Sequence, residues 1–307
     1  MKTKLFNRTL TDSNSWYNCW NSEDIYLPFL KYVYETNHIK HGEEFIPQKI
    51  ANSVFRIGNT IIKIFCPPEA DIKDDKLYET ELEAMKFCKS KGVLTPDIIC
   101  TETVYDSLYS FPYIVMNYIN GIESIKAIPG YSNSQKIEFA VKLKEIANKI
   151  HVPAKINIPQ YNDPCKINGL WNKMPESFRE DRIRYLSSVK FPEPVFAHGD
   201  LGHINIIIDK QGFLYLIDFS ESLLAPYYYD WSFIYNDDDF GKDPIIMKTY
   251  FSNYKNEEFY ETQTIAWLIN WFGAVFINWR SKEMGIDFKS ITSVNALRDL
   301  IIMLLNR

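Results

Sequence analysis

The feature that most constrains this chain is one segment of its second half, residues 194–219. A polar stretch, His198–Asn205, is followed by the apolar run Ile206–Ile208, and after a turn at Gly212 a second apolar run leads to Asp218. Two short apolar runs separated by a turn predict a β-hairpin. The segment is therefore predicted to be a polar loop followed by a hairpin whose second strand ends in a carboxylate.

The polar residues of this segment are the types that phosphoryl transfer requires. In that reaction the transferred group becomes highly charged, so the protein must position the reactants and neutralise charge with a metal ion. The candidate catalytic residues are Asp200, expected to orient an attacking hydroxyl and accept its proton, and His198, expected to hold the loop through hydrogen bonds. Asn205 and Asp218 are expected to hold Mg²⁺ through oxygen atoms, which this hard cation prefers. Each of these residue types is common in turns, so the prediction depends on their joint spacing.

A second hairpin is predicted in the first third of the chain. Two β-rich runs, Ser53–Ile57 and Thr60–Phe65, are separated by the turn residues Gly58-Asn59. Lys63 lies in the second run among apolar residues, where a buried charge needs a partner. In nucleotide kinases a strand lysine binds the nucleotide phosphates and is oriented by a glutamate on the neighbouring helix. The alternative is a lysine that extends from an edge strand into solvent.

The neighbouring helix is predicted over Asp74–Lys89 and offers three glutamates, Glu79, Glu81 and Glu83. At about 100° per residue, Glu81 falls inside the apolar arc of this helix. The other two fall outside it, where solvated charges are expected. Glu81 is therefore the predicted partner of Lys63.

The run Tyr113–Ile119 is predicted to be the last strand of a small sheet and to lead into a linker. Backbone groups near Asn117 and Tyr118 are expected to bind a purine base, with Met116 packed behind it, although an apolar strand before a turn is also ordinary core. Helical patterns predict five further helices, at Ser22–Tyr34, Ser134–Ile150, Glu176–Leu186, Thr262–Trp279 and Ser290–Leu305.

Together these residues resemble the aminoglycoside phosphotransferase family, which shares the two-lobed fold of protein kinases. The resemblance covers most of residues 45–235 and is most specific at His198–Phe219. It implies an α+β fold with a small N-terminal antiparallel β-sheet lobe, carrying one helix, and a larger, mainly helical C-terminal lobe. The implied domains are an N-terminal extension (1–44), a nucleotide-binding lobe (45–120) and a helical catalytic and substrate-binding lobe (121–307).

Individual positions follow the family or depart from it. Asp230 resembles the structural aspartate that braces the family's catalytic loop. Where the family often has a glycine in its phosphate loop, this chain has Lys49–Ser53, so Asn52 and Ser53 are the candidate residues there. About a dozen residues separate Asp218 from Asp230, with no Ala-Pro-Glu after them, whereas protein kinases have a longer activation segment. A small-molecule kinase is therefore expected.

The acceptor is left open by the sequence. In the family it binds near acidic residues of the helical lobe, which makes Asp237, Asp238 and Asp239 candidates for binding a polycationic aminoglycoside. A solvated acidic turn is the alternative. Amino-sugar and homoserine kinases are further possibilities, and so is a non-catalytic kinase-like scaffold. A scaffold, however, need not keep buried charges that cost stability.

Tryptophans suggest a different acceptor, because aromatic rings can form a cage for a quaternary ammonium such as that of choline. Those of the helical lobe are Trp171, Trp231, Trp267, Trp271 and Trp279. At helical spacing Trp267 and Trp271 are instead expected in the core.

Composition argues against several other functions. The chain has 34 Lys and Arg against 39 Asp and Glu, a net charge of −5, and no basic run, so nucleic acid is not an expected partner. The five cysteines are scattered, which indicates neither a zinc site nor a disulfide framework and fits a reducing cytoplasm. No signal peptide is recognisable, and the apolar stretch Ile265–Trp279 is shorter than a membrane span and is expected to be a buried helix. The expectation is a cytoplasmic enzyme with ATP or GTP as donor, Mg²⁺ as cofactor, a small-molecule acceptor, and no membrane or obligate protein partner.

Overall fold

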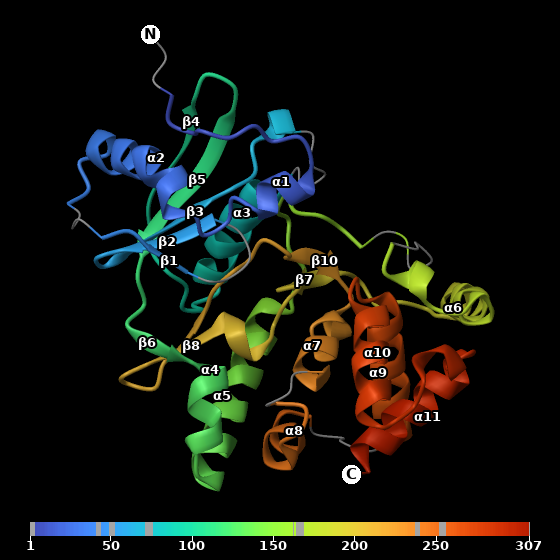
Figure 1. Ribbon diagram of the computed structural model, residues 1–307. Helices are drawn as coiled ribbons and strands as arrows, with labels where there is room; N and C mark the ends of the chain where they lie inside the picture. Colours follow the sequence, from blue (N-terminus) through green and yellow to red (C-terminus); the bar gives the residue numbers. More distant parts are fainter. Residues whose placement is uncertain are drawn as a thin grey trace.

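The computed structural model describes residues 4–40, 44–48, 53–70, 76–161, 163, 169–236, 240–251 and 256–306. Within these ranges the chain forms two lobes (Figure 1). A small lobe built on a β-sheet lies above a larger lobe that is mainly helical.

An antiparallel sheet forms the centre of the small lobe. Its strands are, in spatial order, β1 (Ile46–Pro47), β2 (Ser53–Ile57), β3 (Thr60–Ile64), β5 (Ser110–Asn117) and β4 (Ile98–Tyr105). The predicted hairpin is confirmed, because Ile57 pairs with Thr60 and Gly58 takes the positive φ of 59° that such a turn requires. Side chains alternate between the two faces of a strand, so the sheet contributes to two separate cores.

One face of the sheet packs against α3 (Leu77–Ser90) and the other against the N-terminal extension. Phe55 and Ile62 belong to the core shared with the extension. Ile114 and Met116 belong to a core that continues through α3 into the helical lobe. The extension contributes two helices, α1 (Ser13–Tyr17) and α2 (Glu23–Thr36). It is therefore a layer of the small lobe rather than an appendage.

Hydrogen bonds also tie the extension to the sheet. The backbone N–H groups of Leu5 and Phe6 donate to the carboxylate of Asp106 in the turn between β4 and β5. The N–H of Leu10 donates to the hydroxyl of Tyr109 at 2.8 Å. The start of the described chain is thereby anchored to a turn about one hundred positions later.

Helices make up most of the second lobe. They are α4 (Ser124–Ala127), α5 (Asn133–Ile150), α6 (Glu176–Ser188), α7 (Trp231–Asn236), α8 (Pro244–Tyr250), α9 (Glu257–Ile269), α10 (Gly273–Glu283) and α11 (Val294–Leu305). One short sheet joins β6 (Gly121–Glu123), β8 (Ile206–Asp209) and β9 (Leu214–Leu216), and another joins β7 (Val195–Ala197) and β10 (Leu223–Ala225). The β8–β9 pair is the hairpin predicted after the polar loop. No helix in the described ranges is long and apolar enough to cross a membrane.

Two contacts fix the small lobe against the strands that carry the polar loop. The rings of Phe87 on α3 and Phe196 on β7 lie 4.7 Å apart between centroids. The N–H of Leu216 on β9 donates to the carbonyl of Leu94, just after α3, at 3.0 Å. The helix predicted to orient Lys63 therefore rests directly on the candidate catalytic segment.

The single helix predicted over Thr262–Trp279 is wrong, since two helices, α9 and α10, occupy this stretch. Asn270 separates them. Its side-chain oxygen accepts a hydrogen bond from the N–H of Phe272 at 2.8 Å, and its amide nitrogen donates to Ser232 at 2.7 Å. Such side-chain bonds to nearby backbone compete with helix continuation.

Other boundaries differ by a few residues. The predicted helix start at Asp74 lies outside the described residues. The strand predicted over Tyr113–Ile119 is Ser110–Asn117. The last helix starts later than Ser290, because Ser293 provides the N-terminal cap.

Candidate active site

Lys63 links the two lobes. Its Nζ lies 2.5 Å from Oε2 of Glu81 on α3 and 2.6 Å from Oδ1 of Asp218, which follows β9. The side chains of Lys63 and Glu81 are 5% and 2% exposed, and β3 is an inner strand of the sheet. The predicted ion pair is therefore present, and the alternative of a lysine extending from an edge strand is wrong.

The pKa values of Lys63, Glu81 and Asp218 are set by burial and by the neighbouring charges. Burial by itself would lower the pKa of Lys63, but Asp218 and Glu81 outweigh it and raise this pKa, so the ammonium stays charged. Burial raises the pKa of Glu81 in spite of the opposing attraction of Lys63. Burial also acts to raise the pKa of Asp218, but Lys63 and a 3.0 Å hydrogen bond from Ser220 hold it below its usual value. Asp218 is thus ionised at neutral pH.

Asn205 joins the polar loop to the end of the hairpin. Its side-chain amide donates to the carbonyl of Asp200 at 2.9 Å and to Oδ2 of Asp200 at 2.8 Å. Its own carbonyl accepts the N–H of Ile217, the residue before Asp218, at 3.0 Å. The amide nitrogen of Asn205 is therefore used within the protein.

The donor set of Asn205 and Asp218 fits a magnesium ion. Both residues supply oxygen atoms, and Mg²⁺ is usually held by one or two side chains together with waters and substrate phosphates. Within the described part of the chain, no group of three or more His, Cys, Asp or Glu could hold a metal ion by itself. Asp218 also has a φ of 59°, a backbone conformation that is uncommon for residues other than glycine and often marks functional sites.

Asp230 is fully buried and braces the polar loop. It accepts hydrogen bonds from the backbone N–H groups of His198 at 2.8 Å and of Gly199 at 2.9 Å. Burial acts to raise the pKa of Asp230, but the side chain of His151, 2.9 Å away, and the other groups around it hold this pKa below its usual value. Gly199 has a φ of 84°, and a Cβ there would lie 1.9 Å from the carbonyl oxygen of Glu221. The loop backbone is therefore fixed on two sides.

His198 acts within the loop through hydrogen bonds. Its Nε2 lies 3.2 Å from the carbonyl oxygen of Ile217, and the N–H of Asp200 donates to its Nδ1 at 3.4 Å. These contacts require a neutral ring that carries its hydrogen on Nε2. Burial lowers the pKa of His198, which favours the same neutral form.

Two backbone N–H groups of the linker have partners within the protein. Met116 is buried on the face of the sheet that packs toward the helical lobe. The N–H of Asn117 donates to the carbonyl of Asp97 at 3.0 Å, and that of Tyr118 donates to the carbonyl of Asn59 at 2.8 Å. Binding of a purine by other backbone groups of this segment stays a prediction.

The side chain of Ser53 faces away from the nucleotide side of the sheet. Its hydroxyl donates to the hydroxyl of Tyr26 on α2 at 2.8 Å, and the residue is fully buried. Alternation along β2 places the side chain of Ser53, like that of Phe55, on the face covered by the extension, so only the backbone of Ser53 stays a candidate for phosphate binding. Four other candidates lie outside the described residues: Asn52, Asp237, Asp238 and Asp239.

The sequence profile of the phosphotransferase enzyme family matches residues 44–268. The chain belongs to the phosphotransferase enzyme family. A comparison with curated proteins gives no match.

Solved structures show that this phosphotransferase has the two-lobed, kinase-like fold. The GDP complex of wild-type aminoglycoside 2'-phosphotransferase-IIIa is 14% identical, with a TM-score of 0.58 over 91% of this chain and 98% of that chain. The ADP-bound aminoglycoside phosphotransferase APH(2'')-Ib is 15% identical, with a TM-score of 0.55 over 89% and 95%. Choline kinase LicA from Streptococcus pneumoniae is 18% identical, with a TM-score of 0.55 over 90% and 99%. The fold is thus shared by enzymes with different acceptors.

Two residues of the phosphotransferase site had not been predicted. Ser220, which bonds to Asp218, was detectable as a hydroxyl two residues beyond a candidate ligand. His151, which bonds to Asp230, follows the last residue of α5. Nothing local distinguishes a histidine at a helix end, because its partner lies 79 positions away in the chain.

The tryptophans are divided between core and surface. Trp171 and Trp267 are buried, whereas Trp271 and Trp279 are 50% and 59% exposed. The expectation of a core position for Trp271 is wrong, because this residue lies in the break between α9 and α10. Its backbone N–H donates to the hydroxyl of Tyr229, next to the brace residue Asp230, at 3.2 Å.

Proposed function

We propose that this phosphotransferase transfers the γ-phosphoryl group of ATP or GTP to a hydroxyl group of a small molecule. The observation that carries the proposal is the position of Asp200. Its carboxylate is held by Asn205, whose backbone is bonded to the residue before Asp218. Asp200, the proposed base, and Asp218, a proposed metal ligand, are therefore connected through Asn205. Lys63 of the small lobe contacts Asp218 directly.

Each residue of the cluster has a role in this proposal. Lys63, oriented by Glu81, binds the phosphates of the nucleotide. Asp200 orients the acceptor hydroxyl and accepts its proton. Asn205 and Asp218 hold Mg²⁺, whose charge stabilises the phosphates during transfer.

The proposed acceptor is an aminoglycoside-type antibiotic. Proteins of the same fold have been solved as a GDP and kanamycin complex and as a gentamicin complex. The net charge of −5 favours the approach of a polycation. Asp237, Asp238 and Asp239 are the proposed acidic contacts.

A second candidate is a kinase of a small amine such as choline. It is favoured by Tyr229, whose hydroxyl bonds to the backbone of the exposed Trp271. Aromatic rings and carboxylates together bind quaternary ammonium groups.

The test is nucleotide turnover with Mg²⁺, using ATP and GTP separately, against aminoglycosides, choline and amino sugars. The control is Asp200→Asn, which keeps the side-chain shape and removes the base. We expect acceptor-stimulated turnover that falls about 10²- to 10⁴-fold in the variant, while nucleotide binding is retained. Equal turnover by the variant would contradict the role of Asp200.

The identity of the stimulating acceptor decides between the two candidates. An aminoglycoside substrate also predicts a raised inhibitory concentration when the protein is expressed in a susceptible host. Stimulation by choline alone rejects the antibiotic and supports the amine kinase. Nucleotide binding without stimulation by any acceptor supports the scaffold alternative.

A further inference from the structure

Helix α3 covers the sheet of the small lobe on one side of Lys63. Antiparallel pairing places Val54, Lys63 and Ile114 in one row across β2, β3 and β5, with their side chains on the same face. Phe65, two positions further along, packs against Tyr78 of α3, with the ring centroids 5.4 Å apart. A nucleotide whose phosphates are bound at Lys63 must therefore extend along the sheet in the other direction.

The next row in that direction consists of Arg56, Ile61 and Met116. It lies about 6.6 Å from the row of Lys63, because the two rows are two residues apart on each strand. Ile61 packs against the core that faces the helical lobe, and Arg56 is only partly buried. Arg56 thus lies on the nucleotide side of the sheet, at the distance where the base of the nucleotide is expected.

The guanidinium of Arg56 lies over the start of the linker. Its Cζ is 3.7 Å from the centroid of the ring of Tyr118, the residue that follows β5. Its Nε donates to the carbonyl of Gly58 at 3.1 Å. Among the described residues no carboxylate pairs with Arg56, and its two terminal nitrogens form no hydrogen bond. Four N–H groups are therefore left for a ligand.

The chemistry of a purine base decides whether it can use these donors. Guanine presents the acceptors O6 and N7 along one edge, which arginine binds in protein–nucleic acid complexes, whereas adenine presents an N–H donor at position 6. A guanidinium therefore matches the carbonyl oxygen of guanine and leaves the amino group of adenine without a partner. The N–H groups of Asn117 and Tyr118 are already bonded to the carbonyls of Asp97 and Asn59, so these two linker groups do not replace Arg56 as donors.

We propose that Arg56 selects a purine with a carbonyl group at position 6, and hence GTP rather than ATP, as the phosphoryl donor. Its terminal nitrogens donate to O6 of the base while its plane rests on the ring of Tyr118. The selection rests on the proposed function, which places the phosphates at Lys63. Arg56 determines specificity and takes no part in the transfer itself.

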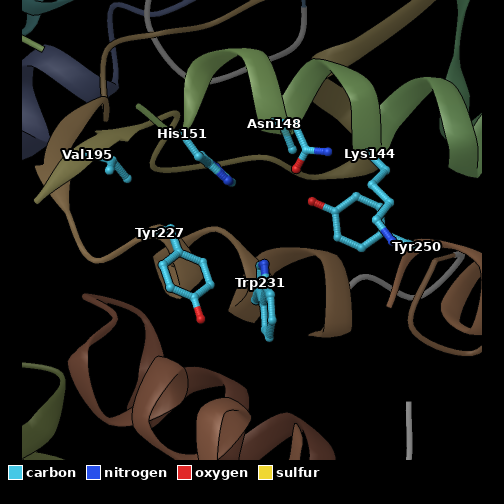
Figure 2. A pocket seen from close by; sticks show the side chains of 8 residues that line it. Lys144, Asn148, His151, Val195, Tyr227, Trp231 and Tyr250 are labelled. Carbon is cyan, nitrogen blue, oxygen red and sulfur yellow. The ribbon is translucent and has the colours of Figure 1, made fainter. Parts of the chain in front are cut away.

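A cavity of about 300 Å³ in the helical lobe provides a control. It lies between α5 and the segment that carries Tyr227 and Trp231 (Figure 2). Neither Lys63 nor Arg56 lines this cavity, so it is not the site of the base. Asn148, on the α5 side in Figure 2, is the position at which a larger side chain would fill it.

Binding of nucleoside diphosphates to the full chain, measured by calorimetry with Mg²⁺, tests the selection without an acceptor or turnover. GDP and IDP carry O6, whereas ADP and the diphosphate of 2,6-diaminopurine riboside carry an amino group at that position. The diaminopurine keeps the 2-amino group of guanine and IDP lacks it, so the four ligands distinguish position 6 from position 2. We expect GDP and IDP to bind at least about ten times more tightly than the other two, which corresponds to about 1.4 kcal/mol.

Variants assign the preference to Arg56. Arg56→Met is expected to weaken binding of GDP and IDP about ten-fold and to change that of ADP less than about two-fold. Lys91→Met is the matched control, because Lys91 also lies over an aromatic ring of the small lobe, 5.2 Å from the centroid of Phe87, but follows α3 rather than lying on this face. Asn148→Trp is the control for the cavity. Both controls are expected to keep the preference, and thermal unfolding of each variant shows that the fold is kept.

The role of Arg56 is overturned if ADP binds as tightly as GDP, or if the variant Arg56→Met keeps the preference. It is also overturned if IDP behaves like ADP or the diaminopurine behaves like GDP, because position 2 would then be the group that is recognised. Binding of all four ligands without discrimination rejects this selection alone. Binding of none of them rejects the proposed function as well.

Discussion

Nζ of Lys63 lies 2.6 Å from Oδ1 of Asp218, although the two residues are 155 positions apart in the chain. This bond joins the sheet of the small lobe to the end of the hairpin in the helical lobe. Glu81 binds the same ammonium at 2.5 Å. The ammonium group of Lys63 therefore compensates the carboxylates of Glu81 and Asp218, which belong to different lobes.

Replacing Lys63 alone and together with Glu81 distinguishes the effect on stability from the effect on nucleotide turnover. Lys63→Met leaves Glu81 buried without a cation, and we expect the free energy of unfolding to fall by about 3–5 kcal/mol in urea denaturation. The double variant Lys63→Met, Glu81→Gln removes the buried charge and is expected to recover much of this loss, while nucleotide turnover stays absent. A double variant no more stable than the single one would show that the buried charge of Glu81 is not the cause.

His198 makes stability depend on pH in the weakly acidic range. Because burial lowers its pKa, the folded protein excludes a proton that the unfolded chain binds below about pH 6.5. The contribution of His198 is therefore complete above that pH and is lost as the pH falls toward the lowered value. We expect the free energy of unfolding to fall less between pH 7.5 and pH 5.5 in His198→Gln than in the unmodified protein. An equal fall in both proteins would show that His198 does not cause the dependence.

Gly199 cannot be replaced by alanine without moving its neighbour. A Cβ at this position would lie 1.9 Å from the backbone oxygen of Glu221, so Gly199→Ala is expected to cost about 3 kcal/mol or more and to abolish turnover. Gly285 is a matched control, because its φ is 70° and a Cβ there meets nothing within 4 Å. Gly285→Ala should show only the backbone strain, about 1–2 kcal/mol, and retain turnover. Equal effects of the two changes would rule out the clash with Glu221.

The hydroxyl of Tyr26, on helix α2 of the extension, accepts a hydrogen bond from the hydroxyl of Ser53. Tyr26→Phe leaves the buried Ser53 hydroxyl without this partner, and we expect a loss of about 1–3 kcal/mol in the free energy of unfolding. Tyr32→Phe, on the same helix and 42% exposed, provides the comparison and should change stability by less than about 0.5 kcal/mol. If both variants unfold at the same urea concentration, the bond between Tyr26 and Ser53 contributes nothing.

Features that depend on spacing within one element were predictable from the sequence. Lys63 stood out as a charge inside an apolar strand, and helical geometry alone distinguished Glu81 from its two neighbouring glutamates. The hairpin turn at Gly58 was visible because few residues accept its backbone conformation. These predictions needed no knowledge of the rest of the fold.

Features that depend on distant partners were not predictable. The direction of Ser53 is set by a helix that lies some thirty positions earlier and covers the outer face of the sheet. The break at Asn270 requires Ser232 as a partner, and the N–H of Asn117 is taken up by Asp97. In each case a local pattern had two interpretations, and tertiary contacts decided between them.

The anchoring of the extension has a consequence for how this chain is made. Leu5 bonds to Asp106, and the rings of Trp16 and Phe29 pack against Phe111. At a synthesis rate of about 5–20 residues per second, the extension waits roughly 5–20 s for these partners. During that time its aromatic residues are exposed on the nascent chain. The small lobe closes only after β5 has left the ribosome, because Phe111 on that strand is the partner of both rings.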